Sequence, residues 1–326
     1  MSRREREGAR KQIVNISLCH NPAARLICFG KEAMDMPDGF VLVTQLLPER
    51  IRRAAASLPV ETRGAAEELR LRCGAEPSLL LPEGEITLSQ CGAVRGEDLS
   101  EVLERTTGCS LHAHADELRR GFLIARGGAR VGVCGTAVIA DGRVSALRAL
   151  SSLCIRVPRQ IRSAGEGVLP SLTGVGSVLI LSPPGGGKTT FLRELVRHSA
   201  ESGLRVSLAD ERGEVAAVWE GVPQFDVGRC TDILTGAPKA EAAILLLRAM
   251  NPQIIALDEI TAREDIGAVA GVAACGVGVY ATAHASKVDD LAKRPLYREL
   301  MELGVFEKAV VICGTGRGRS YEVTAL

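Results

Sequence analysis

Aromatic residues are scarce in this chain. They make up 3% of its 326 residues, and a single Trp is present. Proteins that hold single-stranded nucleic acid stack the bases on aromatic side chains, so this composition argues against such a channel. The formal net charge of +1 gives no electrostatic footprint for nucleic acid either. We therefore expect no nucleic-acid partner.

The chain also has few lysines and no closely paired cysteines. Only 7 of its 40 basic residues are Lys, so Lys188 is an unusual choice. Ten cysteines occur without a C-x-x-C pair. Those in apolar runs are expected to be reduced core residues rather than zinc ligands or a disulfide framework, namely Cys134, Cys154, Cys275 and Cys313.

We expect no membrane-spanning segment in this chain. The one candidate is Ile266 to Ala283, 18 residues without a charge. Its glycines and alanines make it weakly apolar, and Gly276 divides it into a helix over about 262–275 and a strand. Residues 1–11 mix five basic with two acidic residues, which is not a secretion signal. We therefore expect a cytoplasmic protein.

The most informative motif present is an apolar strand followed by a glycine-rich loop. Val178 to Leu181 leads into Ser-Pro-Pro-Gly-Gly-Gly-Lys-Thr-Thr at 182–190 and then into an amphipathic helix. The backbone N–H groups of such a loop and the helix N-terminus bind phosphates, and the lysine reaches the outer phosphates. The motif predicts an ATP site formed by Pro184, Gly185, Gly186, Gly187, Lys188, Thr189 and Thr190.

The loop and its helix have two further features. Ser182 occupies the position of the usual first glycine, and Pro183 and Pro184 lack N–H groups, so the amides of 185–190 are expected to form the phosphate cradle. In the helix, an apolar face is expected to consist of Phe191, Leu192, Leu195 and Val196. The polar face is expected to consist of Arg193, Glu194 and Arg197.

A second motif is a short apolar run that ends in two carboxylates. Residues 253–257 indicate a buried parallel strand, and Asp258 and Glu259 follow it. We expect Thr189 to ligate Mg²⁺ and Asp258 to hold the ion through water. Glu259 is then placed to orient and deprotonate the attacking water.

Two more predicted strands end in polar residues. The strand over 205–210 leads into Glu211, and the strand over 277–283 leads into His284. Because ligands of open α/β sheets bind at the carboxyl ends of strands, both residues are expected beside the phosphates. His284 is a candidate γ-phosphate sensor rather than a general base, or else a hydrogen-bonded histidine at a strand end.

The length and the order of these motifs predict two domains. We expect an α/β fold in which a RecA-like P-loop NTPase core with a mostly parallel sheet spans 171–326. A smaller α+β N-terminal domain at 40–150 precedes it, and a linker at 151–170 joins the two.

The first 38 residues differ from the rest because they lack hydrophobic periodicity. They are expected to be a disordered arm, or else the start of the chain is assigned too far upstream and Met34 or Met36 is the true initiator.

Periodicity in the N-terminal domain predicts its elements. Helices are expected over 41–58, 65–71, 98–107 and 115–125. A hairpin is expected over 78–88, and a strand over 130–138 that turns at 141–142. His112 and His114 are expected at the surface, because no third metal ligand lies nearby in the sequence.

Arginines gather at the domain boundary, at positions 156, 159 and 162. An arginine finger supplies positive charge to phosphoryl transfer from a neighbouring domain or subunit. These residues form either a solvated face or such a finger, for which Arg156 is the candidate.

The series of motifs in this order resembles the stage III sporulation protein AA family over about residues 45–326. The motifs lie, in chain order, at 118–124, 127–132, 151–156, 182–190, 226–228, 231–234, 238–241, 257–260, 281–284 and 293–295. That family is similar to the ATPases of type II and type IV secretion and of pilus motors. The resemblance implies a hexameric ring and an N-terminal domain that closes over the nucleotide.

The resemblance also implies roles for single residues. Glu211 and Glu214 match an acidic box, and His284 matches a histidine box. Arg130 and Arg156 match basic positions near the domain boundary. One position differs, because residue 230 is a cysteine where the family has an arginine before a Thr-Asp pair.

These motifs predict Mg²⁺-dependent ATP hydrolysis. The resemblance implies in addition that the protein is a cytoplasmic ring ATPase that powers or gates a secretion-like membrane channel during endospore formation. The candidate catalytic residues are Glu259, Arg156, His284 and Glu211. An integral membrane protein of the sporulation channel, reached from the mother-cell side, is the partner that the resemblance implies. Two other classes stay open, a nucleic-acid-dependent RecA-like motor and a nucleotide-gated scaffold with little turnover.

Overall fold

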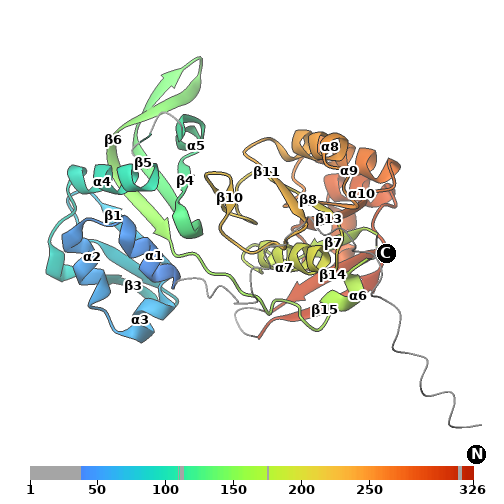
Figure 1. The fold of residues 1–326 in the computed structure, drawn as a ribbon, viewed down its shortest axis with the longest axis horizontal. Helices are drawn as coiled ribbons and strands as arrows, with labels where there is room; N and C mark the ends of the chain where they lie inside the picture. The colour runs from blue at the N-terminus through green and yellow to red at the C-terminus, as the bar shows by residue number, and fades with distance from the viewer. Residues whose placement is uncertain (1–37, 109, 111–113, 175, 315–317) are drawn as a thin grey trace, which may run out of the picture. The chain divides into compact units, whose positions relative to one another are not determined.

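The computed structural model describes residues 38–108, 110, 114–174, 176–314 and 318–326. The expected N-terminal arm therefore lies almost entirely outside the described residues, and His112 does too. The described residues form two large sheets (Figure 1).

Within the described residues, the first sheet has six strands in the order β3-β2-β1-β6-β5-β4, and all neighbours are antiparallel. The strands are β1 (Glu68–Arg72), β2 (Ser78–Leu81), β3 (Gly84–Thr87), β4 (Phe122–Ile124), β5 (Arg130–Ala140) and β6 (Arg143–Arg156). The helices of this region are α1 (Gly39–Leu46), α2 (Glu49–Ala56), α3 (Val60–Ala65), α4 (Gly96–Thr106) and α5 (Ala115–Arg119), with short 3-10 turns η1 (Ser89–Cys91) and η3 (Arg126–Gly128). Helices α1, α2 and α4 share one hydrophobic core with the sheet.

The helix expected over 41–58 is two helices. Helix α1 ends at Leu46, and α2 begins at Glu49 with Pro48 as its N-cap. Proline lacks a backbone N–H group and excludes helical backbone at the residue before it, which explains the break.

The prediction of a helix over 65–71 is wrong. The chain forms β1 there, in which buried Leu69 and Leu71 alternate with half-buried Glu68 and Arg70. This two-residue period is that of a strand with one face on a core.

The prediction of a helix over 115–125 is correct only as far as Arg119. Gly121 has a φ of 83°, a conformation that ends helices, and residues 122–124 join the sheet as β4. The helix expected over 98–107, the hairpin over 78–88 and the turn at 141–142 are confirmed as α4, β2–β3 and β5–β6.

The second described sheet has seven strands in the order β11-β8-β12-β13-β7-β14-β15. All neighbours are parallel except the final antiparallel pair, β14–β15. Its strands are β7 (Val178–Leu181), β8 (Val206–Asp210), β11 (Thr231–Thr235), β12 (Ile254–Leu257), β13 (Gly278–Ala283), β14 (Lys308–Cys313) and β15 (Ser320–Ala325). The helices are α6 (Leu169–Leu172), α7 (Lys188–Glu201), α8 (Lys239–Ala249), α9 (Arg263–Ala274) and α10 (Pro295–Glu302), with η4 (Val288–Lys293) and a small hairpin of β9 (Val218–Trp219) and β10 (Val222–Pro223).

Both faces of this sheet are covered. Along β7, Leu179 and Leu181 belong to a core with α8, α9 and α10, whereas Val178 and Ile180 belong to a core with α6 and α7 (Figure 1). Buried strands of this kind read as continuous apolar runs, which is why they could be predicted. All the parallel strands point the same way, so their carboxyl ends meet along one edge.

Two other expectations concern the run at 266–283 and the cysteines. The run is α9 followed by β13, as predicted, and no helix of the described residues is long and apolar enough to cross a membrane. The prediction of core cysteines is wrong, because Cys134 and Cys275 are exposed and Cys154 and Cys313 are only partly buried. All four are free thiols.

Candidate functional site

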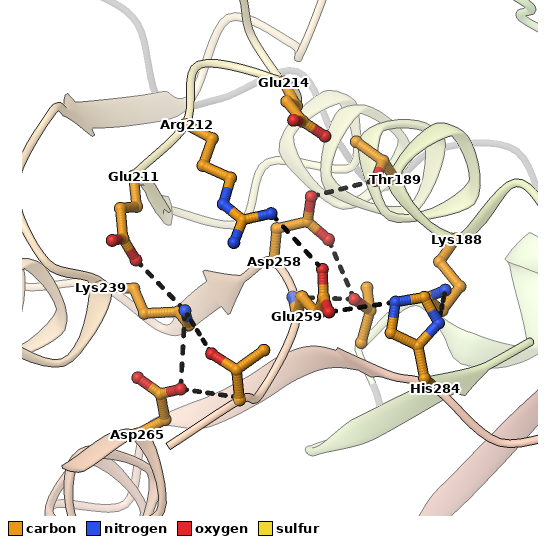
Figure 2. A network of polar contacts seen from close by, with 12 residues as sticks. Lys188, Thr189, Glu211, Arg212, Glu214, Lys239, Asp258, Glu259, Asp265 and His284 are labelled. Atoms are coloured by element: carbon orange, nitrogen blue, oxygen red, sulfur yellow. Dashed lines mark hydrogen bonds and ion pairs between the residues drawn. The ribbon is translucent and has the colours of Figure 1, made fainter. Parts of the chain in front are cut away.

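The residues expected at the nucleotide site meet at the carboxyl edge of the second sheet (Figure 2). Lys188 and Thr189 follow β7, Asp258 and Glu259 follow β12, and His284 follows β13. These three strands are neighbours in the sheet, so short loops bring the five side chains together.

The glycine-rich loop is shaped by backbone conformations that favour glycine. Gly185 and Gly187 have φ angles of 72° and 98°. A Cβ on Gly186 would lie 2.4 Å from Oγ of buried Ser182, so the serine fills the space that the glycine leaves. Ser182 Oγ in turn donates to the carbonyl oxygen of Pro183 at 2.8 Å.

Lys188 is buried at the start of α7. Its Nζ donates to the carbonyl oxygens of Ser182 and Pro183, at 3.3 and 3.4 Å. Burial lowers the pKa of this lysine from its ordinary value. The ammonium group therefore lies inside the loop without a carboxylate in contact with it in the described chain, which favours an incoming anion.

Thr189 and Asp258 contact each other directly. Thr189 Oγ1 donates to Asp258 Oδ2 at 3.0 Å, and Thr282 Oγ1 on β13 donates to Asp258 Oδ1 at 2.9 Å. Burial raises the pKa of the Asp258 carboxyl above its ordinary value, against these two hydrogen bonds. A hydroxyl and a carboxylate at this distance offer the oxygen ligands that Mg²⁺ prefers.

Glu259 has an unusual backbone conformation. Its φ is 47°, in the left-handed region that non-glycine residues avoid. The backbone N–H group of Glu259 donates to Thr282 Oγ1 at 2.8 Å, which helps to hold this conformation. Strained backbone of this kind is concentrated at functional sites.

His284 lies between Glu259 and Lys188. Its Nδ1 is 2.9 Å from Lys188 Nζ, and its Nε2 is 3.0 Å from Glu259 Oε1. Because an ammonium group only donates, Nδ1 accepts, and the ring proton is on Nε2, where it is donated to the carboxylate. Arg212 also faces Glu259, at 3.9 Å.

The loop after β8 is organised by Asp210. The buried carboxylate accepts the backbone N–H groups of Glu214, Val215 and Ala216, at 3.0, 3.2 and 2.9 Å. Burial raises the pKa of Asp210 to about 6. The loop presents Glu214, which pairs with Arg130 of β5.

The prediction that Arg193 and Glu194 lie on a polar face of α7 is wrong, because both side chains are buried. The Arg193 guanidinium donates to the carbonyl oxygens of Val215 and Glu214, at 2.5 and 2.8 Å. Burial lowers the pKa of Arg193 to about 10. The helix therefore uses a buried charge to fix the loop that carries Glu211 and Glu214.

In the described chain, the arginines at 156, 159 and 162 form their ion pairs and hydrogen bonds with residues outside the candidate site. Arg156 pairs with Glu68 of β1 at 3.2 Å, and 62% of its side chain is exposed. Arg159 donates to two backbone carbonyl groups at positions 64 and 66, and Arg162 pairs with Asp226 at 3.5 Å.

A family model described as sporulation stage III, protein AA matches residues 41–322. The chain belongs to this family. The protein named Stage III sporulation protein AA of Bacillus subtilis (strain 168) is 33% identical to it over 273 residues, which are 82% of this chain and 88% of that protein. The resemblance inferred from the motifs is thereby confirmed.

Solved structures of secretion and pilus ATPases have a similar fold. The ATPase DotB of Yersinia pseudotuberculosis aligns with a TM-score of 0.56 and 14% identity, over 85% of this chain and 80% of its own. The pilus retraction motor PilT with bound ADP aligns with a TM-score of 0.56 and 16% identity, over 80% of this chain and 79% of its own. The predicted α/β fold is therefore confirmed.

The roles of Thr282 and Lys239 in the site of this sporulation-family chain were not predicted from the sequence. Lys239 at the start of α8 is 8% exposed, and its Nζ lies 3.2 Å from Glu211 Oε2 and 3.6 Å from Asp265 Oδ2 (Figure 2). It also donates to Thr261 Oγ1 at 3.3 Å. Lys239 thus joins the loops that follow β8 and β12. Lysine is rare in this chain, and this rarity is the signal in the sequence that could have drawn attention to Lys239.

Proposed function

We propose that this protein hydrolyses ATP in a Mg²⁺-dependent reaction on a RecA-like P-loop core. One observation carries the proposal: residues from three strand ends form a chain of contacts from Lys188 through His284 to Glu259, beside the Thr189–Asp258 pair. Phosphoryl transfer needs mainly positioning and charge stabilisation, and these residue types supply both.

The residues present fit ATP and Mg²⁺. The amides of 185–190 are available as a cradle at the start of α7, with Pro184 at its entrance and Thr190 in the first helical turn. Thr189 and Asp258 would hold the ion, Asp258 through water. When bound, Mg²⁺ neutralises charge on the β- and γ-phosphate oxygens.

Glu259 is the proposed general base. A water oxygen attacks the γ-phosphorus, the bond to the bridging oxygen of ADP breaks, and the proton of the water passes to the Glu259 carboxylate. The products are ADP and inorganic phosphate. His284 senses the γ-phosphate through its two contacts. An anion that draws Lys188 Nζ away from Nδ1 removes one hydrogen bond of the ring, and the same ring holds Glu259 through Nε2.

Glu211 and Glu214 have a positioning role in this proposal. Lys239 holds Glu211, and Arg130 holds Glu214, so the loop after β8 is fixed from two sides. These carboxylates then keep the acidic side of the nucleotide site in place.

We further propose that the active form is a homo-hexameric ring, as in the family to which the resemblance points. Arg156, being mostly exposed, would reach the nucleotide of a neighbouring subunit as a finger. The expected linker at 151–170 begins later, because residues 152–156 of β6 pair with β1 in the N-terminal sheet. A linker over about 157–170, between this sheet and the 171–326 ATPase domain, would allow the N-terminal domain to close over the nucleotide.

The proposed place of action is the cytoplasmic face of a sporulation membrane complex on the mother-cell side. The family name supports a role in sporulation, and the similar folds of secretion and pilus ATPases support the powering or gating of a secretion-like channel. An integral membrane protein of that channel is the proposed recruiting partner.

ATP hydrolysis measured with and without Mg²⁺ tests the chemistry. Lys188→Ala should lose nucleotide binding, whereas Glu259→Gln should bind ATP and hydrolyse it about 10² to 10⁴ times more slowly. Glu220→Gln is the matched control, since Glu220 is exposed and has the same φ of 47°. Equal loss of binding in the Lys188 and Glu259 variants would remove the assignment of the base.

Added DNA and added membrane extract separate the functional classes. Stimulation by membranes supports the proposal, strong stimulation by DNA favours a nucleic-acid motor, and binding without turnover favours a nucleotide-gated scaffold. Cell fractionation with and without the neighbouring sporulation membrane proteins tests recruitment. Membrane association that persists without them would contradict it.

A further inference from the structure

Arg319 lies against the glycine-rich loop. It directly precedes β15, and its Nη2 donates to the carbonyl oxygen of Gly185 at 3.4 Å. A Cβ on Gly187 would lie 3.2 Å from Arg319 Cζ and 3.2 Å from Nε. The guanidinium therefore occupies the space beside Gly187 that any larger residue would need.

Arg319 approaches the loop from the side opposite to the carboxylates. The strand β7, which leads into the loop, lies between β13 and β14 in the sheet. Asp258, Glu259 and His284 follow β12 and β13 on one side, whereas Arg319 belongs to the β14–β15 hairpin on the other. Lys188 Nζ contacts His284 and so marks the outer-phosphate side.

The position of Arg319 is fixed by its neighbours. Ser320 pairs with Cys313 in the β14–β15 ladder. The ring of Tyr321 stacks on Phe191, with centroids 5.2 Å apart and planes at 27°. Phe191 belongs to α7, the helix that begins at Lys188, so hairpin and loop are tied to the same element.

The charge of Arg319 lacks a partner among the described residues. No described carboxylate forms an ion pair with it, whereas Arg130 and Arg212 pair with Glu214 and Glu259. Its Nε is buried and has no hydrogen-bond partner in the described chain. A buried donor without an acceptor is costly, and a phosphate oxygen would satisfy it.

We propose that Arg319 is a nucleotide-binding residue that contacts the α- and β-phosphates, on the side of the loop away from Glu259. The inference rests on the ATP site proposed above and adds a second cation to it. A guanidinium offers paired donors that match phosphate oxygens, and the glycine at 187 permits its close approach.

This placement has a specific kinetic consequence. ADP and ATP both carry the α- and β-phosphates, so removal of Arg319 should weaken both by the same factor. An interaction made equally in the ground state and the transition state changes KM and leaves kcat unchanged. Arg319 should therefore differ from Glu259, whose loss lowers kcat.

The test compares the full chain with its Arg319→Ala and Arg319→Lys variants, and with Arg248→Ala as a control at an exposed arginine. Affinities for MgADP and MgATP are measured by calorimetry, pyrophosphate is measured as a competitor, and kcat and KM come from ATP hydrolysis. Arg319→Ala should bind both nucleotides and pyrophosphate about 10- to 100-fold more weakly, with kcat within about twofold. Arg319→Lys should recover part of the loss, because it keeps the charge but not the fork.

Affinities of Arg319→Ala equal to those of the wild type would overturn this inference alone, as would a fall in kcat at unchanged affinity. Weaker ADP binding with unchanged pyrophosphate competition would also overturn it, because the contact would then be to the nucleoside. If wild type and Arg248→Ala bind neither nucleotide, the proposed function fails and this inference with it. Should Arg319→Ala not fold, as judged by its melting temperature, an unchanged affinity in Arg319→Lys overturns the inference and a partial loss supports it.

Discussion

The Glu259 carboxylate lies 3.0 Å from His284 Nε2, while the other nitrogen of the same ring lies 2.9 Å from Lys188 Nζ. One imidazole ring thus links the proposed base to the lysine of the glycine-rich loop. A change at the lysine can reach the carboxylate through two hydrogen bonds.

Replacing His284 with alanine should therefore lower kcat by about 10- to 100-fold and leave ATP affinity within about threefold. The physical reason is that Glu259 loses the donor that orients it, whereas the phosphate cradle is intact. Steady-state hydrolysis and ATP binding measure the two effects. His198→Ala is the control, since His198 contacts Thr173 instead, at 2.7 Å, and an equal fall in kcat there would contradict the role of His284.

Lys239→Ala should destabilise the fold by about 1–3 kcal/mol. The buried Asp265 carboxylate, which also caps α9 by accepting the N–H groups of Thr261 and Ala262, would lose its cationic partner. Chemical denaturation measures the free energy of unfolding. Lys287→Ala, at an exposed lysine, should stay within about 0.5 kcal/mol of wild type, and a similar loss in both variants would remove the special role of Lys239.

Burial raises the pKa of Asp210 from its ordinary value of 3.8 to about 6, which predicts a pH dependence of stability. Between these two values the folded state binds more protons than the unfolded state. The free energy of unfolding should therefore fall as pH rises from about 4 to about 6, by at most about 3 kcal/mol from this group, and then change no further. Asp210→Asn should lack this component, and parallel pH profiles for the two proteins would contradict the assignment.

Gly165→Ala should be strongly destabilising, by about 2–4 kcal/mol. Gly165 has a φ of 74°, and a Cβ there would lie 2.1 Å from the Phe191 ring. Gly267 in α9 has open space around it, so Gly267→Ala should instead stabilise the chain by about 0.5–1 kcal/mol. Melting temperatures of the two variants should shift in opposite directions.

The second sheet could be predicted because its strands are buried on both faces and read as apolar runs. The residues directly after those runs fall at the carboxyl edge without further information, which explains why Asp258, Glu259 and His284 were expected together. In the first sheet, short segments such as 65–71 carry too few residues to separate a period of 3.6 from a period of 2.

Residues that reach the site from other elements could not be predicted in the same way. Lys239 lies at the start of a helix and Arg319 beside a hairpin, and neither follows an apolar run that leads to the loop. Their contacts depend on how α8 and β15 are placed in space, which periodicity does not encode. Likewise, burial of Arg193 depends on loop 211–216 folding over α7.

With Glu259 as the proposed base, its left-handed backbone makes this position a compromise between fold stability and turnover. Glycine adopts a φ of 47° without strain, so Glu259→Gly should raise the melting temperature while it removes the proposed base. Glu220→Gly should raise the melting temperature without a loss of activity. A chain optimised for thermal stability alone would therefore carry glycine at 259, and a loss of hydrolysis in Glu259→Gly but not in Glu220→Gly would tie the strain at 259 to the proposed base.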